Sequence, residues 1–254
     1  MELVLIAIVA LMASMLTFFS GFGLGTILTP FFLLLLDVES AILATAIVHL
    51  LNNLFKVLLV GSHLKLRYVL FFGGAAILGA IGGAKLLHYL AAFDLQLNLP
   101  MAGSVSGIKF FVGLLIVLFA ILELLPKVSF EGSSATFLMS GGILSGFFGG
   151  LSGHQGALRS AFLVKSGLKK ESFIATGIVI ALCVDLARIP VYAGSLGTDF
   201  IFQNSSLILT AIISAFAGAM LGKQFMKKIT MKLIQWIVGI FMIVMGSLTM
   251  FDLV

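Results

Sequence analysis

The stretch GFFGGLSGHQGALRS (Gly146–Ser160) interrupts two strongly apolar runs with five glycines. It then places His154, Gln155 and Arg159 within one or two helical turns. Glycine lets the backbone turn sharply, and a helix that restarts after such a turn offers free N–H groups and the positive end of its dipole. The stretch therefore predicts a break in a membrane helix that can hold an anion.

The composition of the whole chain supports a membrane protein. Of its 254 residues, 61% are hydrophobic and 10% are charged, whereas a soluble domain carries about 25% charged residues. Several runs reach the length of roughly 20 apolar residues that crosses a bilayer. We therefore expect an all-α polytopic membrane protein in the lipid bilayer, with a single transmembrane transporter domain over residues 1–254.

The remaining composition excludes several classes of function. The formal charge is +5, and the lysines and arginines lie mostly in short loops, where they set orientation. No basic face with interleaved aromatic residues suggests a nucleic-acid partner. Cys183 is the only cysteine, so no internal disulfide can form. The first apolar run, residues 3–19, follows Glu2 and lacks a clear cleavage site, so it reads as part of the mature protein.

Enzymatic chemistry has little support. No H-E-x-x-H motif, Walker loop or Cys/His cluster occurs, so we expect no metal and no cofactor. The sequence GLSG, which ends at Gly153, matches the G-x-S-G of rhomboid-like intramembrane proteases. Such a serine needs a histidine base on a later helix. The four histidines are at positions 49, 63, 88 and 154, so none follows it, and we do not expect an enzyme.

The sequence contains two copies of one pattern, about 1–126 and about 132–254. Gly25 and Gly156 are 131 residues apart, and Phe31 and Phe162 have the same separation. Each copy has five apolar segments, of which the second is short and follows a glycine cluster. The segments are about 3–19, 26–36, 41–60, 68–92 and 108–125, then 135–151, 157–165, 172–193, 205–226 and 232–251.

The short segments predict re-entrant hairpins. Eleven helical residues reach only about 16 Å, half the bilayer. The first two segments of each copy should enter and return on the same side, and three full spans follow. An odd number of spans per copy predicts two inverted repeats.

Loop charges agree with this inversion. The turn DVES after the first short segment is acidic, with Asp37 and Glu39, whereas its counterpart KSGLKKE carries Lys165, Lys169 and Lys170. The basic loops thus change sides between the copies, and the last turn of the second copy, with Lys227 and Lys228, is also basic. The loop with Asp94 is nearly neutral and decides nothing. The positive-inside rule then places both termini outside the cytoplasmic membrane.

The restart of each short helix supplies the candidate substrate-binding residues. Two such restarts, related by the inversion, should face each other near the middle of the membrane, where inverted-repeat transporters bind substrate. The first restart contributes Gly23, Gly25, Thr26 and Thr29, and the second contributes Gly153, His154, Gln155, Gly156, Arg159 and Ser160.

Arg159 is the strongest single candidate. A charge in the middle of a membrane helix costs roughly 2.5–3.5 kcal/mol, and the planar guanidinium matches an oxyanion such as sulfite or a sulfonate. The alternative is an arginine that snorkels toward the basic loop at Lys165. For His154 and Gln155 the alternative is hydrogen bonding to loop backbone groups.

Two longer helices add polar positions. Residues 41–60 carry a stripe of Thr45, His49, Asn52 and Lys56, which should face a cavity or a neighbouring helix. His49 and Asn52 are candidates for substrate contact, whereas Lys56 is expected to snorkel.

Asp185 and Arg188, three apart in the segment 172–193, form either an internal ion pair or a proton-linked gate.

The repeated pattern resembles a known family. A glycine-rich break, a short apolar segment and a small-residue Ala-Thr helix occur twice, in GFGLGTILTPFF and in GLSGHQGALRSAFL with IATGIVIALCVDLARIPVY. This pattern is similar to the sulfite exporter TauE/SafE family of bacterial membrane transporters, and the resemblance covers nearly the whole chain. It implies export of sulfite, small organosulfonates or related sulfur anions. The paired breaks themselves suggest that transport occurs by alternating access.

Three functional alternatives remain open at this level. An anion that leaves a cell with a negative interior moves down the electrical gradient, which favours a secondary exporter. A proton-coupled importer of a sulfur compound would need a coupling residue, for which Asp185 is the nearest candidate. A membrane scaffold without transport explains the paired breaks poorly. A homodimer is compatible with the sequence, because lipid-facing and partner-facing apolar surfaces look alike.

Overall fold

The computed structural model describes residues 1–18, 23–93, 95–99, 103–125, 129–197, 199–225 and 231–253. Its helices in the first half are α1 (Glu2–Leu16), α2 (Leu24–Phe32), α3 (Val38–Val60), α4 (Leu66–Tyr68), α5 (Gly74–Ala92) and α6 (Gly107–Leu124). Those in the second half are α7 (Ala135–Ser152), α8 (Gly156–Leu163), α9 (Lys170–Leu196), α10 (Asp199–Gln203), α11 (Ser205–Phe225) and α12 (Met231–Met250).

Six helical runs in the described part of the chain are long and apolar enough to cross a membrane. They are Val38–Leu59, Leu66–Ala92, Gly107–Leu124, Ala135–Ser152, Lys170–Leu196 and Ser205–Gln224. Apolar helices at the two ends, Glu2–Leu16 and Gln235–Met250, are shorter. The chain is therefore a multi-pass helical membrane protein, as the composition predicts.

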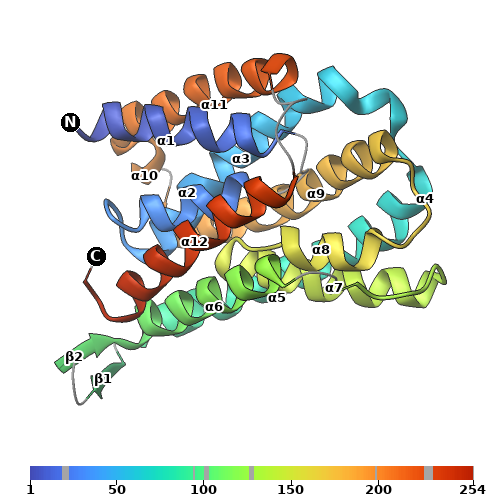
Figure 1. Cartoon of the computed structure of the whole chain (residues 1–254). Coiled ribbons are helices and arrows are strands. Elements are labelled where there is room, and N and C mark those ends of the chain that lie inside the picture. The colour runs from blue at the N-terminus through green and yellow to red at the C-terminus, as the bar shows by residue number, and fades with distance from the viewer. Residues whose placement is uncertain are drawn as a thin grey trace.

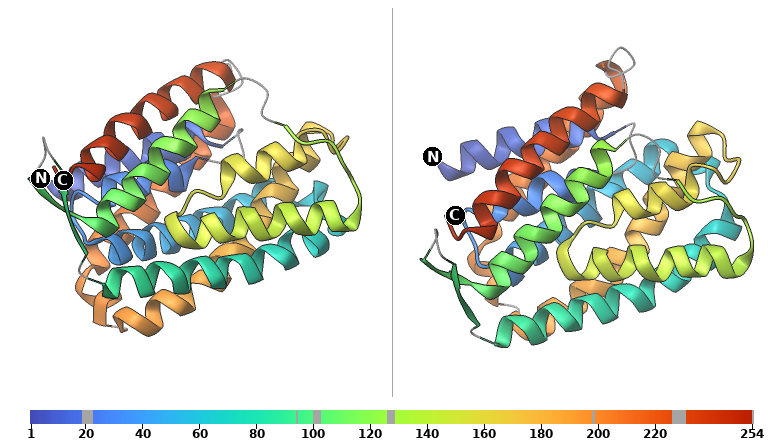
Figure 2. Two further views of the ribbon diagram at one scale, coloured as in Figure 1. Left: turned by 90° about the horizontal axis from the view of Figure 1, so that it is seen from below. Right: turned by 60° about the horizontal axis from the view of Figure 1, so that its bottom comes forward.

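Corresponding helices of the two halves run in opposite directions. In Figure 1, α1, α3 and α6 run from left to right, whereas α7, α9 and α12 run from right to left. The short helices α2 and α8 reverse the direction of the helices that precede them, α1 and α7. Both chain ends lie at the left, and the two views of Figure 2 agree.

In the hairpin of α7 and α8, contacts join the segment before α7 to the end of α8. The backbone N–H of Phe130, before α7, donates to the carbonyl of Ala161 near the end of α8, with an N–O distance of 3.0 Å. The Lys165 ammonium contacts the Glu131 carboxylate and thereby lowers the pKa of that carboxyl. Since α8 returns to the end of the molecule at which α7 begins, the two helices form a hairpin.

Close contacts between helices of different halves hold the bundle together. α5 packs on α7, α1 on α11, α6 on α12 and α3 on α9. Small residues permit this approach: a Cβ atom on Gly146 of α7 would lie 2.0 Å from the carbonyl oxygen of Ala76, and one on Gly218 of α11 would lie 2.2 Å from that of Leu11. Glycine is therefore required at both contacts.

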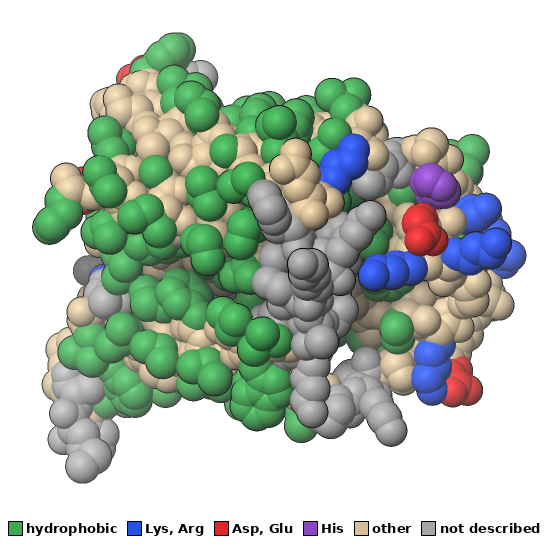
Figure 3. Space-filling view, turned by 45° about the horizontal axis from the view of Figure 1, so that its top comes forward, with side chains coloured by type: hydrophobic (Ala, Val, Ile, Leu, Met, Phe, Trp, Pro, Cys, Tyr) green, Lys and Arg blue, Asp and Glu red, His purple; other side chains and the backbone are tan. Residues whose placement is uncertain are grey.

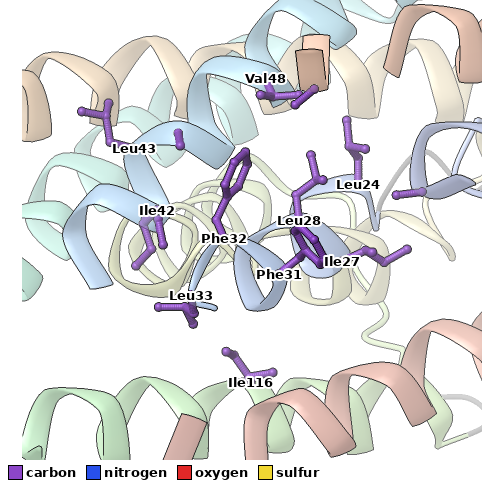
Figure 4. Close-up of a cluster of buried hydrophobic side chains, with 14 of the residues drawn as sticks. Leu24, Ile27, Leu28, Phe31, Phe32, Leu33, Ile42, Leu43, Val48 and Ile116 are labelled. Atoms are coloured by element: carbon purple, nitrogen blue, oxygen red, sulfur yellow. The ribbon is translucent and has the colours of Figure 1, made fainter. Parts of the chain in front are cut away.

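The short helix α2 lies in the hydrophobic core. All nine of its residues are buried. Figure 4 shows Leu28, Phe31 and Phe32 among apolar side chains of α3, with Ile116 of α6 nearby. Nine residues rise only about 14 Å, so this helix stays inside the protein, where its terminal backbone groups avoid lipid.

Two features depart from the sequence-based expectation. The loop between α5 and α6 contains an antiparallel hairpin of β1 (Gln96–Leu99) and β2 (Gly103–Ser106), whereas only helices were expected. The alternation of polar and apolar residues in QLNL is the signal for such a strand. A π-helical turn, Val69–Gly73, also interrupts the helical run that leads into α5.

Asp94, Lys227 and Lys228, whose charges enter the comparison of the loops, lie outside the described residues.

Charged side chains are distributed unevenly between the two ends. Figure 3 shows Lys and Arg side chains gathered at the right end, opposite the chain termini, with hydrophobic side chains over the rest of that face. The loops at that end contribute exposed Lys65, Arg67, Lys165, Lys169 and Lys170.

Candidate functional site

The two predicted breaks are present, and each is made by a glycine. Gly23, directly before α2, has φ of 108°, and Gly153, directly after α7, has φ of 82°. These left-handed conformations are accessible mainly to glycine. The N–H of Gly153 donates to the carbonyl of Gly149 at 3.1 Å and closes α7. The chain then turns and restarts as α8 at Gly156.

The two breaks touch each other. A Cβ atom on Gly25 would lie 3.4 Å from the carbonyl oxygen of Gly153. A Cβ atom on Gly153 would in turn lie 2.9 Å from Thr29 Oγ1. The structure thus brings together two glycine-rich stretches separated by about half the chain, as the repeat pattern predicts.

Helices α3 and α9 form the walls of this junction. The Cβ position of Gly25 lies 3.7 Å from Thr45 Cγ2 and 3.9 Å from His49 Cδ2, both on α3. The Cβ position of Gly153 lies 3.5 Å from Nη1 of Arg188 on α9. Side chains that are distant in sequence therefore surround the same two backbone turns.

A buried charge network links these walls. Asp185 accepts two hydrogen bonds at Oδ1 from Arg188, from Nε at 3.1 Å and from Nη2 at 2.8 Å, and its Oδ2 lies 2.6 Å from His49 Nδ1. Arg188 Nη1 donates to the carbonyl of Gly149 at 2.7 Å. Asp185 and Arg188 are fully buried. The expected pair is therefore present, and it extends to α3 and to the end of α7.

The network places His49 against a neighbouring helix, which is one of the two arrangements predicted for its polar stripe. Its ring contacts Asp185, and the Asn53 amide nitrogen lies 3.2 Å from its Nδ1. His49 thus connects α3 to α9 while its Cδ2 edge faces the break. Tyr192, one turn beyond Arg188, donates to the carbonyl of Gly150, a contact that the sequence did not suggest.

Asn52 and Lys56 face another part of the core. The Asn52 amide is satisfied when its NH2 group donates to Ser14 Oγ at 3.1 Å and to the Ala215 carbonyl at 3.2 Å, while its oxygen accepts from Lys56 Nζ at 3.2 Å. These partners lie on α1, α11 and α3. Lys56 is 4% exposed, with Nζ 5.8 Å from the ring centre of Phe18. The expectation that Lys56 snorkels is therefore wrong, because its ammonium has polar and aromatic partners inside the bundle.

Arg159 is buried on α8, with 3% of its surface exposed. Its Nη1 donates to Gln155 Oε1 at 3.3 Å, and its Nε lies 3.5 Å from the Cβ position of Gly177 on α9. The side chain thus points into the protein, which excludes the snorkelling alternative. Ser160, the next residue, is half-buried, and Gly156 is buried at the start of the helix.

Several buried polar atoms near the junction lack a hydrogen-bond partner. Within the part of the chain that the structure describes, these atoms are Thr29 Oγ1, Thr45 Oγ1, His154 Nε2, Gln155 Nε2 and Glu123 Oε2. The first four belong to the breaks or to the α3 wall. An unpaired buried polar group costs about 1–3 kcal/mol, so such groups normally bond to water, an ion or a ligand. Thr26 differs, since its hydroxyl donates to the Gly23 carbonyl at 2.6 Å.

Glu123 is a candidate that the sequence analysis missed. It lies on α6, four residues after Phe119, whose ring stacks on His154 with ring centres 5.9 Å apart. The Glu123 side chain is 8% exposed. It stands near the end of an apolar segment of the sequence, and only the packing of α6 shows that the carboxyl is buried.

A substitution at Gly153 tests the contact between the breaks. Gly153→Ala should lower the free energy of unfolding by more than the roughly 1–2 kcal/mol expected for a left-handed alanine, because the fully buried Thr29 cannot withdraw from the added methyl group. Gly167→Ala is the control, since Gly167 has a similar φ of 76° and no atom within 4 Å of its Cβ position. Equal losses in detergent unfolding experiments would show that the two breaks are not in contact.

Comparison with known proteins identifies the family of this chain. The family model described as "Sulfite exporter TauE/SafE" matches residues 6–249. No curated protein and no solved structure matches the chain. Because the match includes both breaks and both walls of the junction, the chain belongs to the sulfite exporter TauE/SafE family.

Proposed function

We propose that this protein is a secondary transporter that exports sulfite or a related small sulfur oxyanion across the bacterial cytoplasmic membrane by alternating access. The family assignment supports anion export. The observation that carries the finer proposal is the junction of the two breaks, where partnerless hydroxyl and amide groups lie beside buried arginines. This combination suits a small oxyanion, which needs several donors and positive charge at once.

The two halves of the chain act in this proposal as inverted repeats. The opposite helix directions in Figure 1 support this relation, and so do the paired contacts of α5 with α7 and of α11 with α1. In such transporters the substrate binds at the repeat interface, near the middle of the membrane. The contact between Gly25 and Gly153 would lie on that interface.

The distribution of charge supports an orientation with both termini outside. The end opposite the termini carries the exposed loop lysines and arginines seen in Figure 3. Cytoplasmic loops are enriched in these residues. In this orientation α7 and α8 enter from the cytoplasm, whereas α1 and α2 enter from the outside.

The substrate oxyanion would bind at the restart of α8. The helix offers its first backbone N–H groups and the positive end of its dipole. Thr29 and Thr45 can donate hydroxyl hydrogens, and the partnerless Nε2 of Gln155 can donate as well. Arg159 brings a guanidinium one turn along the same helix, and its contact with Gln155 orients both side chains.

The network of His49, Asp185 and Arg188 is proposed as the gate. It joins α3, α9 and the Gly149 carbonyl of α7. When one part of the bundle rocks against the other, these contacts must rearrange, because they cross the junction. The network therefore offers two discrete arrangements of the same buried charges.

A transport assay tests export. Proteoliposomes loaded with sulfite should release it when an inside-negative potential is imposed, since each charge moved gains about 2.3 kcal/mol per 100 mV. Sulfonate, thiosulfate and sulfate complete the panel. The proposal fails if none of these anions shows potential-dependent efflux. Uptake of a sulfur compound that collapses when an uncoupler is added would indicate a proton-coupled importer instead.

Replacement of Arg159 tests the binding site. Arg159→Gln should reduce sulfite efflux about 10- to 100-fold, because a hydrogen bond from a charged donor contributes about 1.5–3 kcal/mol. Arg67→Gln is the control, since Arg67 is exposed and donates to the Ser133 carbonyl in a loop. Both variants should unfold near the wild-type temperature. Unchanged efflux in Arg159→Gln would remove Arg159 from the site.

A further inference from the structure

The hydrogen-bonding pattern of His154 restricts the form of the anion that the junction can accept. Its Nδ1 lies 2.6 Å from the carbonyl oxygen of Ser152. A carbonyl oxygen only accepts hydrogen bonds, so Nδ1 must carry the hydrogen. In the neutral ring, Nε2 then has a lone pair and no hydrogen.

The ring is held in this orientation from two sides. The hydrogen bond to Ser152 positions one edge, and the Phe119 ring stacks on the face at an interplanar angle of 8°. A ring flip would lose the Ser152 bond. His154 is fully buried, and Nε2 has no partner among the residues that the structure describes. The molecule therefore presents a fixed, unused acceptor beside the junction.

This acceptor conflicts with a fully deprotonated anion. All oxygens of the sulfite dianion are acceptors, and two acceptors that face each other repel. One added proton removes the conflict, because it can lie either on the anion as hydrogensulfite or on Nε2 as imidazolium. An organosulfonate carries no such hydrogen at neutral pH, so it requires the imidazolium form.

The surrounding charges favour a proton that arrives together with the anion. Arg159 of α8 and Arg188 of α9 bring two positive charges to the elements packed around His154. Asp185 is already paired with Arg188 and His49, and Glu123 on α6 lies one turn beyond Phe119. An imidazolium in the empty site would add to the positive charge, whereas a bound anion compensates it.

We infer that the junction binds its anion together with one proton, and that His154 selects protonatable oxyanions such as hydrogensulfite over organosulfonates. This inference rests on the proposed function. It also sets the charge that is moved, because a sulfite exported with one proton carries one negative charge and not two.

Proton uptake on binding is the direct test. The full-length protein in detergent is titrated with sulfite in weakly buffered solution, at a pH at which free sulfite is the dianion. One proton should be taken up for each sulfite bound, and the dissociation constant should rise about tenfold for each unit of pH by linkage. This measurement needs no variant. Sulfite binding without proton uptake would overturn the inference while leaving the proposed function intact.

Substitution of His154 tests whether this residue causes the proton uptake. His154→Gln can donate an amide hydrogen to the dianion, so proton uptake and the pH dependence should disappear. The preference for sulfite over methanesulfonate should then narrow at least tenfold. His63→Gln is the control, because His63 is exposed and, in the described chain, its side chain hydrogen-bonds to the neighbouring Ser62. Retained proton uptake in His154→Gln would overturn the role of His154. No saturable binding of any anion would overturn the proposed function and the inference with it.

Discussion

Replacing Asp185 with asparagine is expected to lower the free energy of unfolding by about 3–5 kcal/mol, because it removes the only carboxylate that pairs with Arg188 in the described structure. Both side chains are fully buried. The substitution keeps the shape of the side chain but leaves a guanidinium without a counter-charge inside the bundle. His49 also loses its charged partner on α9.

Unfolding in detergent, by heat or by SDS titration, measures this loss. Asp199→Asn is the matched control, because Asp199 is exposed at the start of α10, and it should change stability by less than about 0.5 kcal/mol. A loss below about 1 kcal/mol for Asp185→Asn would contradict the buried network.

A double variant measures the interaction between Asp185 and Arg188. Asp185→Leu combined with Arg188→Leu removes both charges, so it should be less destabilising than the sum of the two single changes. Additive losses would show that the two side chains do not interact.

Replacing Gly83 with alanine is expected to lower the free energy of unfolding about as much as Asp185→Asn does, through packing alone. The added Cβ atom would lie 1.9 Å from the carbonyl oxygen of Phe147 on α7. The obstacle is backbone, so no rotamer change can relieve it, and α5 and α7 must separate. Overpacking typically costs about 1–3 kcal/mol and occasionally more, and we expect about 3 kcal/mol or more here.

Gly82 offers a control on the same helix. An alanine there meets its nearest atom, Phe147 Cδ2, at 4.0 Å. Since alanine favours helix over glycine by up to about 1 kcal/mol, Gly82→Ala should leave stability unchanged or slightly higher. The comparison uses expression level and unfolding temperature in detergent. Similar behaviour of the two variants would contradict the close contact between α5 and α7.

Much of the fold follows from patterns that are local in the sequence. Apolar runs of membrane length, glycine clusters before two short segments and the order of long and short segments predicted most of the helices to within a few residues, but not the short α10. The hairpin β1–β2 was missed because its strands are only four residues each. The expectation for Lys56 failed because sequence distance from a helix end does not reveal whether a neighbouring helix covers the side chain.

The candidate site was only partly predictable for the same reason. The repeat suggested that Gly25 and Gly153 meet, and helical spacing suggested the pair of Asp185 and Arg188. The link from Asp185 to His49 joins residues 136 positions apart, and the burial of Glu123 depends on how α6 packs. Neither has a local signal.

The sequence by itself determined the membrane class, the two glycine breaks and the family, because hydrophobic length, backbone freedom and motif order are properties of contiguous residues. Only the tertiary structure decided which buried polar atoms have partners. It places His49 on Asp185, turns Arg159 inward and leaves Nε2 of His154 unpaired. Hydrogen bonds inside a protein depend on distances of about 3 Å between side chains from different helices, and those distances arise only when the helices pack.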